Sequence, residues 1–424
     1  MVLFLKVRNF LLNIFERKKI IILLNDSHSI LFFYFIGLGS NLSSLSPYIL
    51  TYFPNEAEII FLSIQFTMPL GSFFGGWISD YTKQLRWLLF LGLVLVIPCQ
   101  FFLFSFPEDW RLTCLFGGLH RFLLSSNYQW LVIGVIEQKG EASFSKIRAS
   151  GTLGFLFVQL LLFILTHPFI SLLENSSQTG KLGAFAYLAI FPFLHFFPLQ
   201  RHSSEKYEWS QAVALIKQKK FIIFFGLSFV FYSAYQVTDN YMGRYLQISY
   251  GLDSVFLGWM LAVILEAPFL VFVPKLNHKF GYSFLFLLSL AAGSLRFLLF
   301  FLSPLGLPKH LVLLFQIPHA ILFAGYYMGG IYWFRKHSPS HVYGSIYGIF
   351  SIFSISFGGM LGNIFCSLLL KDKLGSSILG ELCSNYKSLQ GDFALIFLIC
   401  AINFFILFII FFNLHWQEYK KYHL

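Results

Sequence analysis

The sequence predicts an all-α integral membrane protein with twelve transmembrane helices in two six-helix halves. Its residues are 57% hydrophobic and only 12% charged, and its mean hydropathy is +0.70. Its apolar runs are about twenty residues long, which is the length a helix needs to cross roughly 30 Å of hydrocarbon. Basic connecting segments alternate with weakly charged ones. Together these observations exclude a soluble globular class.

Each helix is predicted from one apolar run bounded by polar, glycine or proline residues. The predicted ranges are 29–51, 57–79, 87–106, 112–135, 148–168, 182–200, 221–246, 255–275, 283–303, 311–334, 342–370 and 392–414.

Charge predicts the orientation of these helices. Most of the 30 Lys and Arg fall in alternate connecting segments, and the positive-inside rule places those segments in the cytoplasm. Both termini are then cytoplasmic. The net charge of +11 belongs to these loops, where anionic lipid headgroups are its natural partner, so nucleic acid is not implied.

The chain also repeats itself. Tyr48 and Asp80 have the same spacing as Tyr245 and Asn277, which aligns the first two predicted helices with the seventh and eighth. Such parallel halves are typical of transporters whose halves move around a central site. The predicted organisation is a basic segment over 1–26, a six-helix bundle over 27–200, a basic cytoplasmic linker over 201–220, a second bundle over 221–414 and a cytoplasmic tail over 415–424. For 1–26, an interfacial helix and a start codon placed too far upstream are both open.

Three apolar segments of the second half each contain one ionisable residue. These are Glu266, Arg296 and His319. An ionisable side chain in a membrane span is costly, so it usually faces the interior, finds a partner and marks a solute or proton path. At 1.5 Å per residue they lie about 10 to 17 Å from the outer ends of their helices. We predict that Glu266 carries a proton, that Arg296 is its partner or an anion ligand, and that His319 assists.

Further polar residues fall near the same depth and predict a solute-binding layer. Arg121 lies too deep in the fourth predicted helix to reach the interface, which favours a cavity-facing cation. The expected solute-binding residues are Arg121, Asn41, Asp239, Tyr235 and Gln316. Helix packing is the alternative for Asn41, and an interhelical charge pair is the alternative for Asp239.

The second predicted helix ends in a pattern that resembles the major facilitator superfamily. Gly76 and Asp80 match its Gly-x-x-x-Asp signature, although Tyr81 and Lys83 stand where the family favours Arg and Gly. The resemblance implies that Asp80 contacts neighbouring helix ends and holds a cytoplasmic gate shut. Arg148, at the predicted start of the fifth helix, is expected to belong to the same gate.

Two further segments resemble the branch of this superfamily that contains phenylpropionate permeases, with lactose permease and nucleoside:proton symporters as more distant members. Residues 146–155 resemble its Arg-x-Trp-Gly-Ser-x-Gly-Phe segment, with Ser150 in place of the tryptophan. Glu266 before Pro268, Arg296, and Gln316-x-x-His319 resemble its charged pattern. The resemblance implies a major facilitator fold and proton coupling through Glu, Arg and His.

We therefore expect a proton-coupled symporter of a small organic solute in a bacterial inner membrane. The solute is an aromatic carboxylate, a sugar or a nucleoside, and its partners are protons and the lipid bilayer. The expected state is a monomer. A proton-driven exporter of amphipathic compounds, sodium in place of protons, and a transport-inactive membrane sensor are the alternatives.

The sequence does not predict an enzyme, a metal site or a cofactor. His337 and His341 form a basic cluster at a predicted membrane end, but no carboxylate lies nearby in sequence to complete a catalytic set. The five cysteines have no CxxC or metal-ligand spacing.

Overall fold

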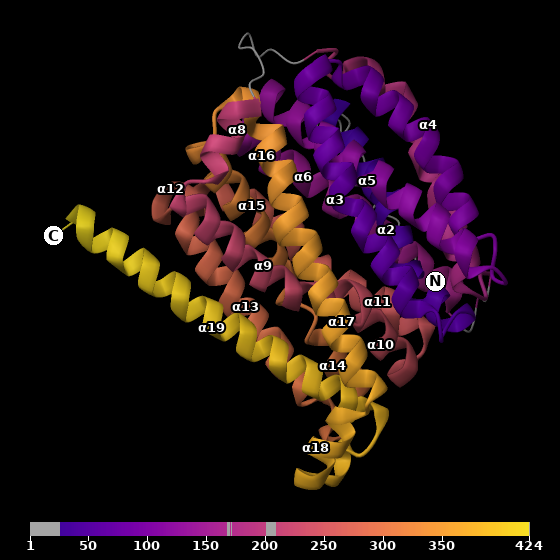
Figure 1. The fold of residues 1–424 in the computed structure, drawn as a ribbon. Coiled ribbons are helices and arrows are strands. Elements are labelled where there is room, and N and C mark those ends of the chain that lie inside the picture. The colour runs from indigo at the N-terminus through magenta and orange to yellow at the C-terminus, as the bar shows by residue number, and fades with distance from the viewer. Residues whose placement is uncertain (1–25, 168–169, 171, 201–208, 424) are drawn as a thin grey trace, which may run out of the picture.

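The computed structural model describes residues 26–167, 170, 172–200 and 209–423, and these residues form helices and connecting turns. The predicted interfacial segment over 1–26 lies outside them, apart from the backbone of its last residue. In Figure 1 the indigo and purple helices lie on one side of the molecule and the orange and yellow helices on the other.

The first half contains six helical segments among the described residues. They are α2 (Asp26–Tyr52), α3 (Ala57–Thr82), α4 (Leu85–Leu103), α5 (Trp110–Lys139), α6 (Glu141–Thr166), and α7 (Ser176–Ala184) continued by the 3-10 helix η2 (Phe185–Phe196). The sixth segment begins six residues before its predicted start at 182. The reason is a cap, because the Asn175 side chain accepts a 3.0 Å hydrogen bond from the Gln178 amide.

The second half contains six more segments, of which several are interrupted. They are α9 (Lys219–Asn240) with α10 (Met242–Tyr250), α11 (Leu252–Val263) with α12 (Glu266–Phe280), α13 (Tyr282–Phe301), α14 (Lys309–Leu314) with α15 (His319–His337), α16 (Tyr343–Phe350) with the π-helix η5 (Ser351–Phe357) and α17 (Gly358–Lys371), and α19 (Leu389–His423). The short connecting elements are α8 (Trp209–Ile216), η3 (Ser303–Leu305), η4 (Ser340–Val342), α18 (Leu374–Leu382) and η6 (Ser384–Tyr386).

The predicted fold class is confirmed, since every predicted segment coincides with helix. Within the described ranges, nine helical segments are long and apolar enough to cross a membrane. The other three predicted spans correspond to α5, to α7 with η2, and to α9. Helix also occurs outside the predicted spans: α8 occupies part of the linker over 201–220, and α19 continues through the tail to His423.

Two prolines explain where the eighth and tenth segments are interrupted. Proline has no amide hydrogen, so Pro268 and Pro318 leave the carbonyls of Ile264 and Leu314 without the usual helical donor. The helix α11 ends at Val263 and α14 ends at Leu314. The next helical piece then begins with Glu266 in one case and with His319 in the other. Both ionisable residues thus lie at breaks, the position at which transporter helices commonly expose polar groups to a solute.

The halves meet along several helix pairs. The helix α3 packs against α16, and α6 packs against both α11 and α12. These contacts bring Glu266 and His319 opposite the polar residues of α5 and α6.

Candidate functional site

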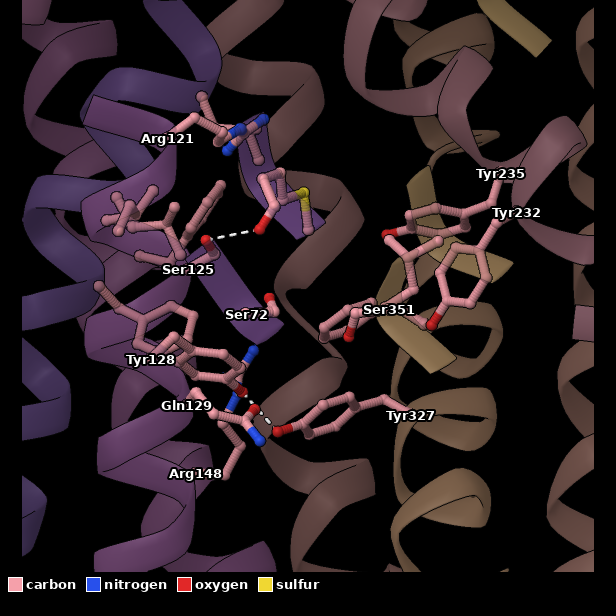
Figure 2. Close-up of a pocket in the computed structure, with 18 of the residues that line it drawn as sticks. Ser72, Arg121, Ser125, Tyr128, Gln129, Arg148, Tyr232, Tyr235, Tyr327 and Ser351 are labelled. Carbon is pink, nitrogen blue, oxygen red and sulfur yellow. Dashed lines mark hydrogen bonds between the residues drawn. The ribbon is translucent and has the colours of Figure 1, made fainter. Parts of the chain in front are cut away.

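A cavity of about 230 Å³ lies between the halves. Helices α2, α3, α5 and α6 form one wall, and α9, α11, α12, α15, α16 and η5 form the other. Its lining is mostly aromatic and aliphatic, with a limited set of polar side chains. Figure 2 shows this separation, with Ser72, Ser125, Tyr128 and Gln129 on one side and Tyr232, Tyr235, Tyr327 and Ser351 on the other.

A buried ion pair joins the two walls. The Nη2 atom of Arg148 on α6 lies 3.3 Å from Oε1 of Glu266 on α12, and the two side chains are 3% and 4% exposed. Thr152 is part of the same cluster, because its hydroxyl donates to Glu266 Oε1 at 2.5 Å and accepts from Arg148 Nη1 at 2.9 Å. Arg148 and Thr152 are one helical turn apart, so they present both groups on one face of α6.

The remaining surface of the Arg148 guanidinium is also occupied. Its Nε donates to the Tyr128 hydroxyl at 3.2 Å, and its carbon lies 4.0 Å from the centre of the Phe35 ring. A desolvated ion pair is stable only when its hydrogen-bonding groups are satisfied. Here the hydroxyls of Thr152 and Tyr128 provide part of that satisfaction.

These contacts differ from the sequence prediction in two respects. The ion-pair partner of Glu266 is Arg148, where we expected Arg296, and Arg148 lies in the cavity wall, where we expected the gate. The cause is the start of the fifth helix. It begins at Glu141, seven residues before the predicted start, so Arg148 lies about 10 Å inside the helix.

Arg296 is fully buried but does not contribute to the lining of the cavity. Its Nε donates to Oε1 of Gln316 at 3.1 Å, and its Nη2 donates to the same oxygen. Its guanidinium also lies 5.1 Å from the centre of the Phe297 ring. Gln316, predicted to bind solute, lies in the turn between α14 and α15 and holds Arg296 instead.

His319 lines the cavity, as expected of a functional residue, and is 3% exposed. Its ring lies 5.9 Å from the ring of Tyr235 and 5.9 Å from that of Trp259. Among the described residues, no hydrogen-bond partner faces its Nδ1. The side chain is therefore placed to bind a polar atom of a solute.

The other predicted solute-binding residues divide into three groups. Arg121 and Tyr235 line the cavity. Arg121 is 8% exposed and lies at the opposite end of the cavity from Arg148 in Figure 2. Asn41 is buried, but it is not part of the lining. The side chain of Asp239 lies outside the described part of the chain.

Gly76 and Asp80 lie where the halves meet at the predicted cytoplasmic end. Asp80 Oδ2 accepts hydrogen bonds from the amide and the hydroxyl of Ser345 on α16, at 3.0 and 2.8 Å. A Cβ at position 76 would lie 2.5 Å from the Gly344 carbonyl oxygen. This close backbone approach requires glycine.

Sequence reasoning missed several polar residues that the structure brings to the cavity, among them Gln65, Gln129, Tyr128 and Tyr327. Neutral polar residues in apolar runs most often serve helix packing, so their type alone gave no signal. The spacing of Arg148 and Thr152 was the one available pointer, since it places a cation and a hydroxyl on one face of a helix.

The fold and the cavity define a multi-pass membrane protein with two helical halves around a central, partly polar site. A family model described as the MFS_1 like family matches residues 27–379. The chain therefore belongs to the MFS_1 like family, and the resemblance to the major facilitator superfamily is confirmed. The members of this family are transporters, so the prediction that the chain is not an enzyme is confirmed.

One curated relative is YegT, a candidate nucleoside transporter of Escherichia coli (strain K12). It is 26% identical over 239 residues, which is 52% of this chain and 54% of YegT, so the match spans about half the length of each protein. The solved structures are more distant in sequence and show the fold. The nucleoside transporter NupG has a TM-score of 0.65 at 18% identity, covering 92% of this chain and 98% of NupG. A transporter of the POT family has a TM-score of 0.67 at 14% identity, covering 92% of this chain and 96% of its own.

Proposed function

We propose that this protein is a proton-coupled symporter that moves a small organic solute by alternating access. It acts as a monomer in a bacterial inner membrane, with both termini in the cytoplasm. The observation that carries the proposal is the ion pair between Arg148 and Glu266, because it is buried, lines the cavity and joins the two halves.

Proton coupling follows from the cost of separating this pair. When the halves move apart, an ionised Glu266 would leave Arg148 in a poorly solvated site, and an unpaired buried charge is strongly unfavourable. A proton on Glu266 removes the negative charge and weakens its attraction to Arg148. Solute bound in the cavity then offers Arg148 and Thr152 replacement contacts. Movement is therefore easiest when proton and solute are both bound, which is the condition for symport.

The solute we propose is a nucleoside, ahead of the sugar and the aromatic carboxylate. The cavity offers aromatic rings for a planar base, including Tyr235 and Phe323, whose ring centres are 6.3 Å apart. It also offers uncharged polar groups for hydroxyls. The relatives YegT and NupG, whose names record nucleoside transport, support the same class.

The test is uptake into proteoliposomes driven by an imposed proton gradient, with labelled uridine, glucose and 3-phenylpropionate. Glu266→Gln is expected to exchange solute across the membrane but not to concentrate it. Glu381→Gln is the matched control, since Glu381 is exposed outside the cavity. If Glu266→Gln concentrates solute as well as the wild type, the proton-coupling role of Glu266 is wrong. If a sodium gradient alone drives uptake, sodium replaces the proton.

A further inference from the structure

Two glutamines on the first-half wall have buried amide groups that the contacts described so far leave unused. Gln65 on α3 is 2% exposed and Gln129 on α5 is 3% exposed, and both line the cavity. Within the described ranges, no hydrogen-bond partner faces the Nε2 atom of either residue. A buried donor without a partner is unfavourable, and the penalty disappears when a ligand accepts its hydrogen bond.

The Gln65 amide lies close to the backbone of the second half. A Cβ at Gly359 on α17 would lie 2.6 Å from Nε2 of Gln65 and 3.0 Å from Oε1 of Gln236, so a larger residue there would require the amide to shift. Gln236 also lines the cavity, so two amides from opposite halves lie near this glycine.

The wall across from Gln129 is flat and aromatic. The rings of Phe323 and Tyr327 on α15 lie 5.6 Å apart with an angle of 7° between their planes. Both line the cavity, and Figure 2 shows Tyr327 on the opposite side from Gln129. A planar solute against these rings would present its edge to the first-half wall, where the amide donors lie.

Charge beside Gln129 disfavours an anionic solute at that end of the cavity. Gln65 lies nearer the Arg121 end, because a Cβ at Gly117 on α5 would meet Ile64 and one at Gly118 would meet Thr67. The cation Arg148 is paired with Glu266, and the glutamine donors are uncharged. Before Glu266 takes up its proton, a carboxylate would add a second negative charge beside it. Arg121 lies at the other end of the cavity, so an anion attracted there would not depend on Gln129.

We propose that Gln65 and Gln129 are specificity-determining residues that donate hydrogen bonds to acceptor atoms of a neutral, planar solute. The site therefore binds nucleosides in preference to aromatic carboxylates. This inference rests on the proposed transport function and adds the residues that select the solute.

The test is calorimetric binding of uridine, adenosine and 3-phenylpropionate to the purified full-length protein in detergent. Gln65→Leu and Gln129→Leu keep the side-chain size but remove the donor. Each is expected to weaken nucleoside binding by about fivefold to thirtyfold, the usual effect of losing one buried hydrogen bond. Gln138→Leu is the matched control, because Gln138 lies on the same helix as Gln129 but is exposed, and its affinity should equal that of the wild type.

Three results would overturn the inference. They are unchanged nucleoside affinity in both glutamine variants, tighter binding of 3-phenylpropionate than of either nucleoside, and no nucleoside binding by the wild type. If a leucine variant does not fold, Gln65→Met and Gln129→Met replace it. Solute binding in detergent does not depend on proton coupling. Proton coupling through Glu266 and solute selection by Gln65 and Gln129 can therefore fail separately. If Glu266→Gln abolishes accumulation while the glutamine variants keep full affinity, only the selection of solute by these amides is wrong.

Discussion

The Tyr128 hydroxyl on α5 lies 2.6 Å from the Tyr327 hydroxyl on α15 and donates a hydrogen bond to it across the two halves. The same Tyr128 oxygen accepts from Nε of Arg148, whose Nη2 contacts Glu266. A continuous series of polar contacts thus begins and ends in the second half and passes through two residues of the first. Any change at Glu266 can therefore reach the Tyr128–Tyr327 contact through Arg148.

Tyr327→Phe should loosen this contact. It removes one hydroxyl and leaves the ring, so the lost interaction is a single hydrogen bond of about 1 kcal/mol, or roughly a fivefold shift toward separated halves. The measurement is the rate at which a membrane-impermeant maleimide labels Ser351→Cys in the cavity wall, in a background without native cysteines. Tyr81→Phe is the control, since Tyr81 is 70% exposed. Equal labelling rates in Tyr327→Phe and the wild type would contradict this role.

Substitutions of the two ion-pair residues, Arg148 and Glu266, should lower stability in a strongly non-additive way. Arg148→Met or Glu266→Met alone leaves one buried charge without its partner, which typically costs about 3–5 kcal/mol. The double variant removes both charges and should be less destabilised than either single variant. Thermal unfolding midpoints in detergent compare the three. Additive losses would mean that the two side chains do not act as a pair.

Asp80 should hold the halves together at the predicted cytoplasmic end. Asp80→Ala removes Oδ2, the oxygen that accepts both hydrogen bonds from Ser345, and a hydrogen bond to a charged group contributes about 1.5–3 kcal/mol. We expect faster maleimide labelling of the cavity from the cytoplasmic side, and a smaller increase for Asp80→Asn, which retains one oxygen. Labelling that increases only from the opposite side would reverse the predicted orientation of the protein.

The packing of α6 against α2 should depend on Gly154. A Cβ there would lie 2.0 Å from the backbone oxygen of Phe32, which no side-chain rotation can relieve. Gly154→Ala is expected to lower stability by about 2 kcal/mol or more, as over-packing of a well-filled core does. Gly226→Ala is the matched control in α9, because a Cβ at that position meets nothing within 4 Å and alanine favours helix by roughly 1 kcal/mol. Equal unfolding midpoints for the two variants would contradict the predicted clash.

The twelve helical segments could be predicted because a membrane requires long apolar runs, and such runs are visible in one sequence. The predicted pairing of Glu266 with Arg296 was wrong for a reason that composition cannot reveal. Which residues meet across two helices depends on where each helix begins and how the helices face each other. An error of seven residues at the start of α6 was enough to place Arg148 at the membrane edge.

The prediction that ionisable residues at one depth in the membrane share one site was correct only in part. It correctly brought Glu266, His319 and Arg121 to one cavity, because ionisable residues in a membrane protein must find a polar site. It could not separate Arg296, which satisfies the same requirement through Gln316 away from the cavity. Gln65 and Gln129 escaped this prediction because it considered ionisable residues only, and a neutral amide in an apolar run most often serves helix packing.

Glycines bring the backbones of α3 and α16 close together. Gly76 faces the Gly344 carbonyl, and a Cβ at Gly348 would lie 2.8 Å from the Phe73 Cα. At these glycines backbone lies against backbone, so no side chain has to change rotamer there when the two helices part. The strength of this contact then resides in a few polar contacts, chiefly those of Asp80 with Ser345. A bulky side chain introduced at Gly348 would therefore act as a wedge, holding this end of the protein open whatever the state of the central site.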